Sequence, residues 1–142
     1  MSMNIRYNMR DFVKKHHQLQ HVRGITYRVA FDKNRSCWHV EISISRDIMK
    51  EANWAIEDHV DVAWDDRRIY LIKKEDGMYK LRFGHYAYSC HPQKRLSGRF
   101  VGCIRCVWKP EFGLPKVNPR VHCQDIKIGK KTVSFLLPNC KC

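Results

Sequence analysis

Residues 60–73 carry the pattern that most constrains how this chain can fold. Hydrophobic and polar side chains alternate on both sides of the turn sequence Asp-Asp-Arg-Arg, which is typical of two β-strands joined as a hairpin. A weaker copy of the pattern occupies residues 125–136 and aligns without a gap. The aligned pairs are Asp61 with Asp125, Val62 with Ile126, Ile69 with Val133, and Leu71 with Phe135. The duplication predicts a pseudo-symmetric barrel, and the alternative is that two unrelated hairpins share a hydrophobic pattern by chance.

The rest of the chain predicts more strands and little helix. The strand-like segments are 25–31, 37–44, 79–88, which is aromatic, and 100–108, which is apolar enough to be a buried strand. Ser45 is the expected N-cap of a short helix that ends near Asn53, and a short basic helix is expected before Gly24. Prolines exclude a long helix between 109 and 120. The predicted class is mainly β (β-rich α+β), with one short N-terminal helix and one short internal helix.

Charge is the strongest composition signal. The 142 residues carry a net charge of +13, and the positive charge is concentrated before residue 37 and after residue 79. Such a polarised surface attracts polyanions through counterion release. Nucleic acid is the leading partner class, an anionic membrane is less favoured, and an acidic protein stays open. The alternative is a basic protein whose charge serves solubility alone.

Two further features bear on the compartment. No apolar run approaches the roughly 20 residues of a membrane-spanning helix, and no apolar secretory segment follows the basic N-terminus. The seven cysteines are odd in number, so a disulfide framework is not favoured. We therefore expect a cytoplasmic protein.

The order of elements in residues 25–74 resembles the AbrB/MazE-type swapped-hairpin domain. In that family an Ile-Pro pair, a short helix and an acidic turn precede a hairpin of the form Val-x-Val-x-x-Asp-Asp-x-x-Ile-x-Leu. Here Ile44-Ser45 stands at the Ile-Pro position, 56–58 is the acidic turn and 60–72 is the hairpin. The chain departs from the pattern at Ser45, where proline is expected, and at Asn53, where glycine is usual.

The resemblance implies a division of the chain. Family members usually dimerise, each chain giving one hairpin pair to a shared barrel, whereas here one chain carries both copies. The expected parts are a basic N-terminal helical segment (1–24), a first swapped-hairpin half (25–77) and a second half with Pro and Cys residues (78–142) that shares the same core. Oligomeric state is left open between a pseudo-dimeric monomer and a homodimer.

The resemblance also implies a DNA-contacting surface, because basic residues of the first strand, the following turn and the helix start bind DNA in the family. The matching positions are Arg28, Arg35, Arg46 and Lys50. In the second half, the same surface is expected from Lys94, Arg95, Arg99 and Lys109. Arginine suits this work because its planar fork binds phosphate or a guanine edge bidentately. The alternative for each residue is a solvated basic face.

Other motifs are weaker evidence for a metal site, a catalytic site or a base-stacking surface. Cys103 and Cys106 have zinc-knuckle spacing, and Cys140 and Cys142 are candidates to complete four ligands. However, the first pair lies in a predicted strand, where positions i and i+3 point to opposite faces, so incidental thiols are the alternative. No local signature selects a catalytic Cys–His pair. Aromatic residues of 79–88 alternate with Lys80 and Arg82 in a way that suits base stacking, although core packing explains them equally well.

Together these features predict a non-enzymatic nucleic-acid-binding protein, a DNA-binding transcriptional regulator with no required cofactor. Its expected partner is double-stranded DNA. The dense cysteine, aromatic and basic residues also fit a phage-type accessory protein. Such a protein would act in the host cytoplasm by binding and inhibiting an acidic host protein, such as a nuclease or a defence complex.

Overall fold

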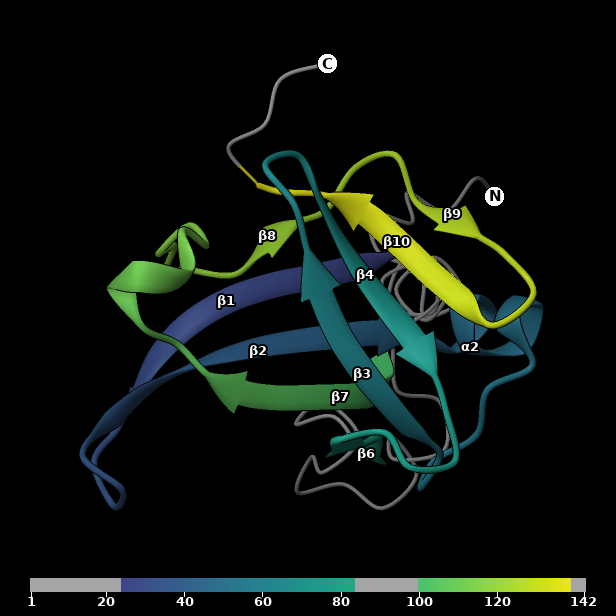
Figure 1. The fold of residues 1–142 in the computed structure, drawn as a ribbon, viewed down its shortest axis with the longest axis horizontal. Helices are drawn as coiled ribbons and strands as arrows, with labels where there is room; N and C mark the ends of the chain where they lie inside the picture. The colour runs from purple at the N-terminus through teal and green to yellow at the C-terminus, as the bar shows by residue number, and fades with distance from the viewer. Residues whose placement is uncertain (1–23, 84–99, 139–142) are drawn as a thin grey trace, which may run out of the picture.

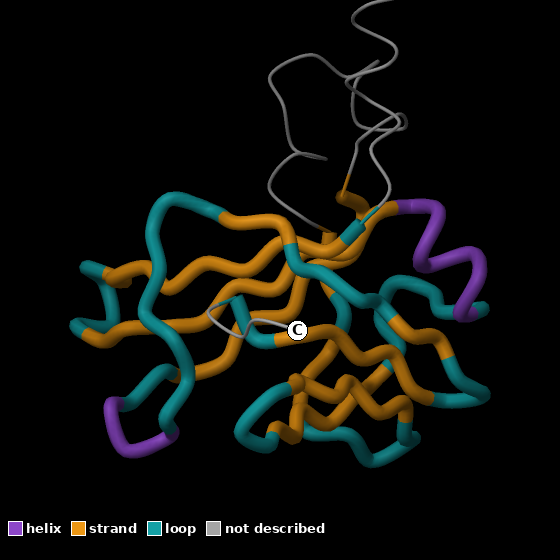
Figure 2. Tube along the Cα trace, turned by 90° about the horizontal axis from the view of Figure 1, so that it is seen from above, coloured by secondary structure: helices purple, strands orange, loops and turns teal. Residues whose placement is uncertain are grey.

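The computed structural model describes residues 24–83 and 100–138 (Figure 1). Its strands are β1 (Ile25–Asp32), β2 (Cys37–Ser45), β3 (His59–Trp64), β4 (Arg68–Lys73), β5 (Tyr79–Lys80), β6 (Arg82–Phe83), β7 (Phe100–Val107), β8 (Val121–His122), β9 (Lys127–Ile128) and β10 (Thr132–Leu136). The helical segments are α2 (Arg46–Ala52) and the 3-10 helix η2 (Pro110–Phe112). The two helical segments lie at opposite ends of the molecule, as Figures 1 and 2 show.

The strands form two antiparallel sheets of five strands each. Sheet A has the order β6-β7-β2-β1-β8, and sheet B has the order β5-β3-β4-β10-β9. In Figure 1, β3, β4 and β10 of sheet B cross over β1 and β2 of sheet A. The prediction of a mainly β chain is thereby confirmed. The expected continuous strand over 79–88 is not formed: its described residues make two short strands separated by Leu81, β5 in sheet B and β6 in sheet A. The remainder of that segment and the expected N-terminal helix lie outside the described residues.

Helix α2 is capped by Ser45 at its N-terminus and by Asn53 at its C-terminus. The Ser45 hydroxyl accepts hydrogen bonds from the backbone N–H of Ile48 (3.4 Å) and of Gly24 (3.0 Å). Asn53 ends the helix in the left-handed conformation, which asparagine tolerates better than most residues. The side chains of Ile48, Met49 and Ala52 are buried, as expected for a short helix held by its apolar face.

The central strand pairs of the two sheets share one constant shift in residue number. Asp125 follows Asp61 by 64 residues, and Arg105 of β7 follows Glu41 of β2 by the same number. Glu41 and Arg105 are cross-strand partners. The same shift carries Tyr70 of β4 onto Ser134 of β10, which are also partners. Antiparallel strands related by a local two-fold axis pair in this way. One shift in numbering therefore relates the partners Glu41 and Arg105 in sheet A and the partners Tyr70 and Ser134 in sheet B.

The second part departs from the first where its sequence differs. Pro110 opens η2 at the position that α2 occupies in the first part, and a 3-10 turn replaces the longer helix. Strand β6 flanks β7 as β1 flanks β2, but the numbering shift carries β1 onto residues 89–96, which lie outside the described residues.

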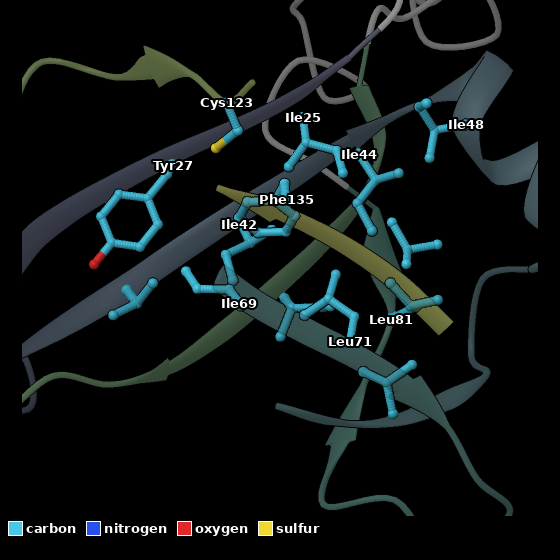
Figure 3. Close-up of a cluster of buried hydrophobic side chains, with 14 of the residues drawn as sticks. Ile25, Tyr27, Ile42, Ile44, Ile48, Ile69, Leu71, Leu81, Cys123 and Phe135 are labelled. Carbon is cyan, nitrogen blue, oxygen red and sulfur yellow. The ribbon is translucent and has the colours of Figure 1, made fainter. Parts of the chain in front are cut away.

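One hydrophobic core lies between the sheets. Alternation turns Ile42 and Ile44 of β2 inward, where they meet Ile69 and Leu71 of β4 and Phe135 of β10 (Figure 3). All five side chains are almost inaccessible to water. Both parts of the chain thus contribute to a single core cluster, and the opposite face of β2 is left for polar residues.

Candidate nucleic-acid interface

A row of charged side chains crosses the outer face of sheet A. Because neighbouring residues of each strand face the core, Arg28, Glu41 and Arg105 project from the opposite face. The register places them side by side, since Arg28 pairs with Glu41 and Glu41 pairs with Arg105. Three strands, one of them distant in sequence from the other two, therefore assemble this row.

Glu41 lies at the centre of the row and contacts the basic side chains around it. Its side chain is 1% exposed, and its carboxylate accepts from Nε of Arg28 at 2.7 Å and from Nη2 of the same residue. Nη2 of Arg105 lies 2.8 Å from Oε1 of Glu41, and Nη2 of Arg120 lies 3.2 Å from Oε2. Nε2 of His39 lies 3.2 Å from Oε1. We call these five residues the Glu41 cluster. Three guanidinium groups around one carboxylate leave a surplus of two positive charges, before any charge on His39.

The arginines hold Glu41 ionised. Burial by itself would raise the pKa of this carboxyl group, but hydrogen bonds from Arg28 and His39 and the charges of Arg28 and Arg105 outweigh it. The resulting pKa is about 2, against an ordinary value of 4.5. Glu41 is therefore a permanent anion at physiological pH, and it fixes the positions of the guanidinium groups that surround it.

This pKa predicts how stability depends on pH. As the pH falls, the unfolded chain takes up the Glu41 proton near pH 4.5, whereas the folded chain takes it up only near pH 2. The stabilisation is thus complete above about pH 4.5 and is lost as the pH falls towards 2. We expect it to amount to roughly 3 kcal/mol, at about 1.4 kcal/mol per pKa unit. Urea unfolding at pH 6 and at pH 3 should detect about 2 kcal/mol of this change, because the folded chain has taken up little of the Glu41 proton at pH 3.

The Glu41→Gln variant is the control for this pH dependence, because it keeps every other carboxyl group. The loss of stability between pH 6 and pH 3 should be smaller in the variant than in the wild type. Equal losses in the two proteins would contradict an ionised, arginine-bound Glu41.

A groove of about 780 Å³ opens beside the cluster, and His39 and Arg105 belong to both. It is lined by residues of β2, β5, β6 and β7 and by the turn between β1 and β2; we call it the β7 groove. Four of its lining residues are cationic, namely Arg35, Lys80, Arg82 and Arg105. Asp32 is the only carboxylate among the described residues that line it, and it accepts from the backbone N–H of Asn34 (2.9 Å).

The β7 groove also has apolar and aromatic surface. Phe83 is 50% exposed, and Val107 and Met78 are exposed as well. Tyr79 lines the groove and is partly buried against the core. The groove thus combines cationic groups with exposed aromatic and aliphatic groups.

The structure separates the basic residues that the sequence grouped together. Arg28 lies in the Glu41 cluster and Arg35 lines the β7 groove. Arg46 and Lys50 lie on α2, at the other end of β2 from Arg35 (Figure 1). Nine strand residues span roughly 30 Å, so α2 and the β1–β2 turn belong to different surfaces.

Of the four basic residues predicted in the second half, the structure describes one. Lys109 follows β7 at the end near the β1–β2 turn, since Val107 pairs with His39. Lys94, Arg95 and Arg99 lie outside the described residues. All eight positions remain predictions; among the described ones, Arg35 lines the β7 groove and Arg28 belongs to the Glu41 cluster.

Sequence reasoning did not select several residues of the site. Glu41 and His39 had a visible signal, because they alternate with Val40 and Ile42 in an apolar strand. Arg105 likewise interrupts an apolar strand. Arg120 had no such signal: it reaches Glu41 from a loop 79 residues away in sequence.

The predicted zinc ligands do not converge within the described part of the chain. Cys103 pairs with Ser43 on the outer face of sheet A, whereas Cys106 pairs with Val40 on the core-facing side. No group of three or more His, Cys, Asp or Glu side chains among residues 24–83 and 100–138 is arranged to hold a metal ion. Burial raises the pKa of the Cys106 thiol to about 11, which keeps it protonated. Cys140 and Cys142 lie outside the described residues.

The turn acids of the first hairpin have a structural role. Asp65 Oδ1 accepts from the backbone N–H of Arg67 (2.8 Å) and of Arg68 (2.7 Å). Aspartate commonly stabilises turns through such bonds to the backbone that follows it. They place Asp65 in the framework of the hairpin, away from the groove.

One further finding concerns the described residues, and another concerns the complete sequence. Within the described residues, no helix has the length and apolar character needed to cross a membrane. Comparison of the chain with models of known protein families, with curated proteins and with solved structures finds no match in any of the three.

Proposed function

We propose that this chain is a non-enzymatic nucleic-acid-binding protein that uses the β7 groove and the adjoining Glu41 cluster. The observation that carries the proposal is the lining of the groove, whose described residues include four cationic side chains and a single carboxylate. Lys and Arg side chains gathered in this way bind phosphates and release the counterions condensed on nucleic acid.

Glu41 supports the proposal by orienting the arginines. Free arginine side chains lose rotamer entropy when they bind a phosphate. Arg28 and Arg105 are already held against a buried carboxylate, so part of this ordering is complete before a ligand arrives. The surplus positive charge of the cluster also raises the potential at the groove, where Arg105 is 45% exposed.

We further propose that the chain contains two swapped-hairpin halves in one barrel, and that it regulates transcription by binding DNA. The support is the strand register, in which one constant shift in numbering relates β2 to β7 and β4 to β10. This pairing is what a swapped-hairpin dimer fused into one chain would have. The resemblance to AbrB/MazE-type domains then suggests DNA as the nucleic acid.

The proposal predicts salt-dependent binding. Labelled oligonucleotides, both duplex and single-stranded, should bind in a fluorescence anisotropy titration at 50 mM salt, and the affinity should fall steeply towards 200 mM. The Arg82→Ala variant should bind more weakly, with a salt slope lower by about one. Lys127→Ala is the matched control, because Lys127 is an exposed lysine on β9 of sheet B that does not line the groove.

Two experiments distinguish nucleic-acid binding from the alternative function, inhibition of an acidic protein. No binding to any nucleic acid at 50 mM salt would refute the proposal. Pull-downs with and without nuclease treatment test the alternative, a protein that inhibits an acidic partner. A stoichiometric partner that survives nuclease treatment, together with absent oligonucleotide binding, would favour the inhibitor.

A further inference from the structure

We infer that the β7 groove binds single-stranded nucleic acid in preference to a duplex, with a base stacked on Phe83 and phosphates held by Lys80, Arg82 and Arg105. The inference rests on the proposed nucleic-acid binding and specifies its ligand, which differs from the duplex DNA that the AbrB/MazE resemblance suggests. It follows from the size of the groove, from the chemistry of its lining and from the rigid attachment of β5 and β6.

The size of the groove favours a single strand. A volume of about 780 Å³ is in the range of pockets that enclose drug-sized ligands. One or two nucleotides of a flexible strand fit such a space. A duplex does not, because its bases are stacked inside a helix whose major groove alone is about 12 Å wide. A duplex would contact only the rim and would leave Phe83 without a base.

The lining has the two components that single-strand binders combine. Cationic side chains follow the phosphate backbone, and aromatic rings stack on bases of any sequence. Within the short segment 79–83, the chain supplies Tyr79, Lys80, Arg82 and Phe83, and all four line the groove. Phe83 is 50% exposed, so part of its ring is accessible to a base.

Leu81 anchors this segment rigidly. Its side chain is fully buried in the core, and its backbone N–H donates to the Asp58 carbonyl at 2.9 Å. Its carbonyl accepts from the Glu57 N–H at 2.8 Å, and Arg82 pairs with Cys103 of β7. The aromatic and cationic side chains on either side of Leu81 are therefore presented from a fixed backbone, which lowers the entropy lost on binding.

The test compares probes of equal length in an anisotropy titration at 50 mM salt. The probes are a 12-nucleotide single-stranded DNA, the corresponding RNA, the DNA duplex and a 12-unit abasic DNA strand. We expect either single strand to bind at least tenfold more tightly than the duplex. The DNA and RNA arms show which sugar the groove prefers. The abasic strand should bind weakly, since it keeps the phosphates but offers no base to Phe83.

The Phe83→Ala variant should weaken single-strand binding roughly 5- to 150-fold, corresponding to about 1–3 kcal/mol for one stacked base. Binding of the abasic strand should be unchanged in this variant, and Phe83→Tyr should restore single-strand binding. Phe31→Ala is the matched control, because Phe31 is 48% exposed but does not line the groove. Thermal unfolding of each variant verifies that it is folded.

Three results would overturn the inference. Duplex binding as tight as single-strand binding, with no effect of Phe83→Ala, would refute it and leave the proposed function intact. Absence of binding to all four probes would refute the proposed function itself. A stable complex with a protein, lost in Phe83→Ala and accompanied by no oligonucleotide binding, would assign the groove to a protein partner instead.

Discussion

Replacing Glu41 by glutamine is expected to destabilise the protein by about 3–5 kcal/mol, the range found when one partner of a buried ion pair is removed. In the wild type, the carboxylate is 1% exposed and lies within 3.2 Å of nitrogens from Arg28, Arg105 and Arg120. Glutamine keeps the shape but removes the negative charge. The three guanidinium groups then repel one another without a counter-charge at their centre.

Urea unfolding at pH 7 measures this effect. Glu57→Gln is the control, because Glu57 forms a solvent-exposed pair with Lys80 at 3.7 Å and should contribute less than about 1 kcal/mol. A loss below about 1 kcal/mol for Glu41→Gln, the value of a surface pair, would mean that the arginines turn into solvent when the charge is removed. The cluster would then not orient them for a ligand.

Replacing Phe135 by alanine is expected to cause the second large loss of folding stability. The ring is fully buried between the two sheets, and its strand partner is Ile69 of the first hairpin. Truncation of a buried phenylalanine costs about 3–5 kcal/mol through lost burial and the cavity that remains. Because Phe135 comes from the second part of the chain and packs against the first, both parts should lose stability together.

This cooperativity is measured by following urea unfolding with tryptophan fluorescence and with far-UV circular dichroism. The two transitions should coincide and shift equally to lower urea in the variant. Phe31→Ala serves as the control, since its half-exposed ring makes an edge contact with Trp38 and should contribute less than about 1.5 kcal/mol. Two separate transitions would show that the parts do not share one core.

Local elements were predictable because their signals lie within a few residues. Alternation along 25–31 and 37–44 predicted β1 and β2, and the helix after Ser45 follows from a capping side chain. The hairpin at 60–73 was visible for the same reason. The repeat in residues 125–136 predicted a second hairpin, and the structure has one in β9 and β10.

The candidate site was predictable only in part. The polar stripe of β2 was visible in the alternation around Glu41, and Arg35 was selected as a basic turn residue. Neither observation shows which strand lies next to β2. Arg105 and Arg120 meet Glu41 only because β7 pairs with β2 and a distant loop returns to the same face. A selection based on local basic residues also included Arg46 and Lys50, which lie at the far end of β2.

The sequence alone determined the strands, the capped helix, the duplicated hairpin and the excess of positive charge, because side-chain period, capping and composition act over short distances. Only the tertiary structure decided which strands are neighbours. Apolar faces of different strands are chemically interchangeable, so pairing depends on the packing of the whole chain. That packing buries Glu41 among three arginines and places Phe83 beside Arg105 in one groove.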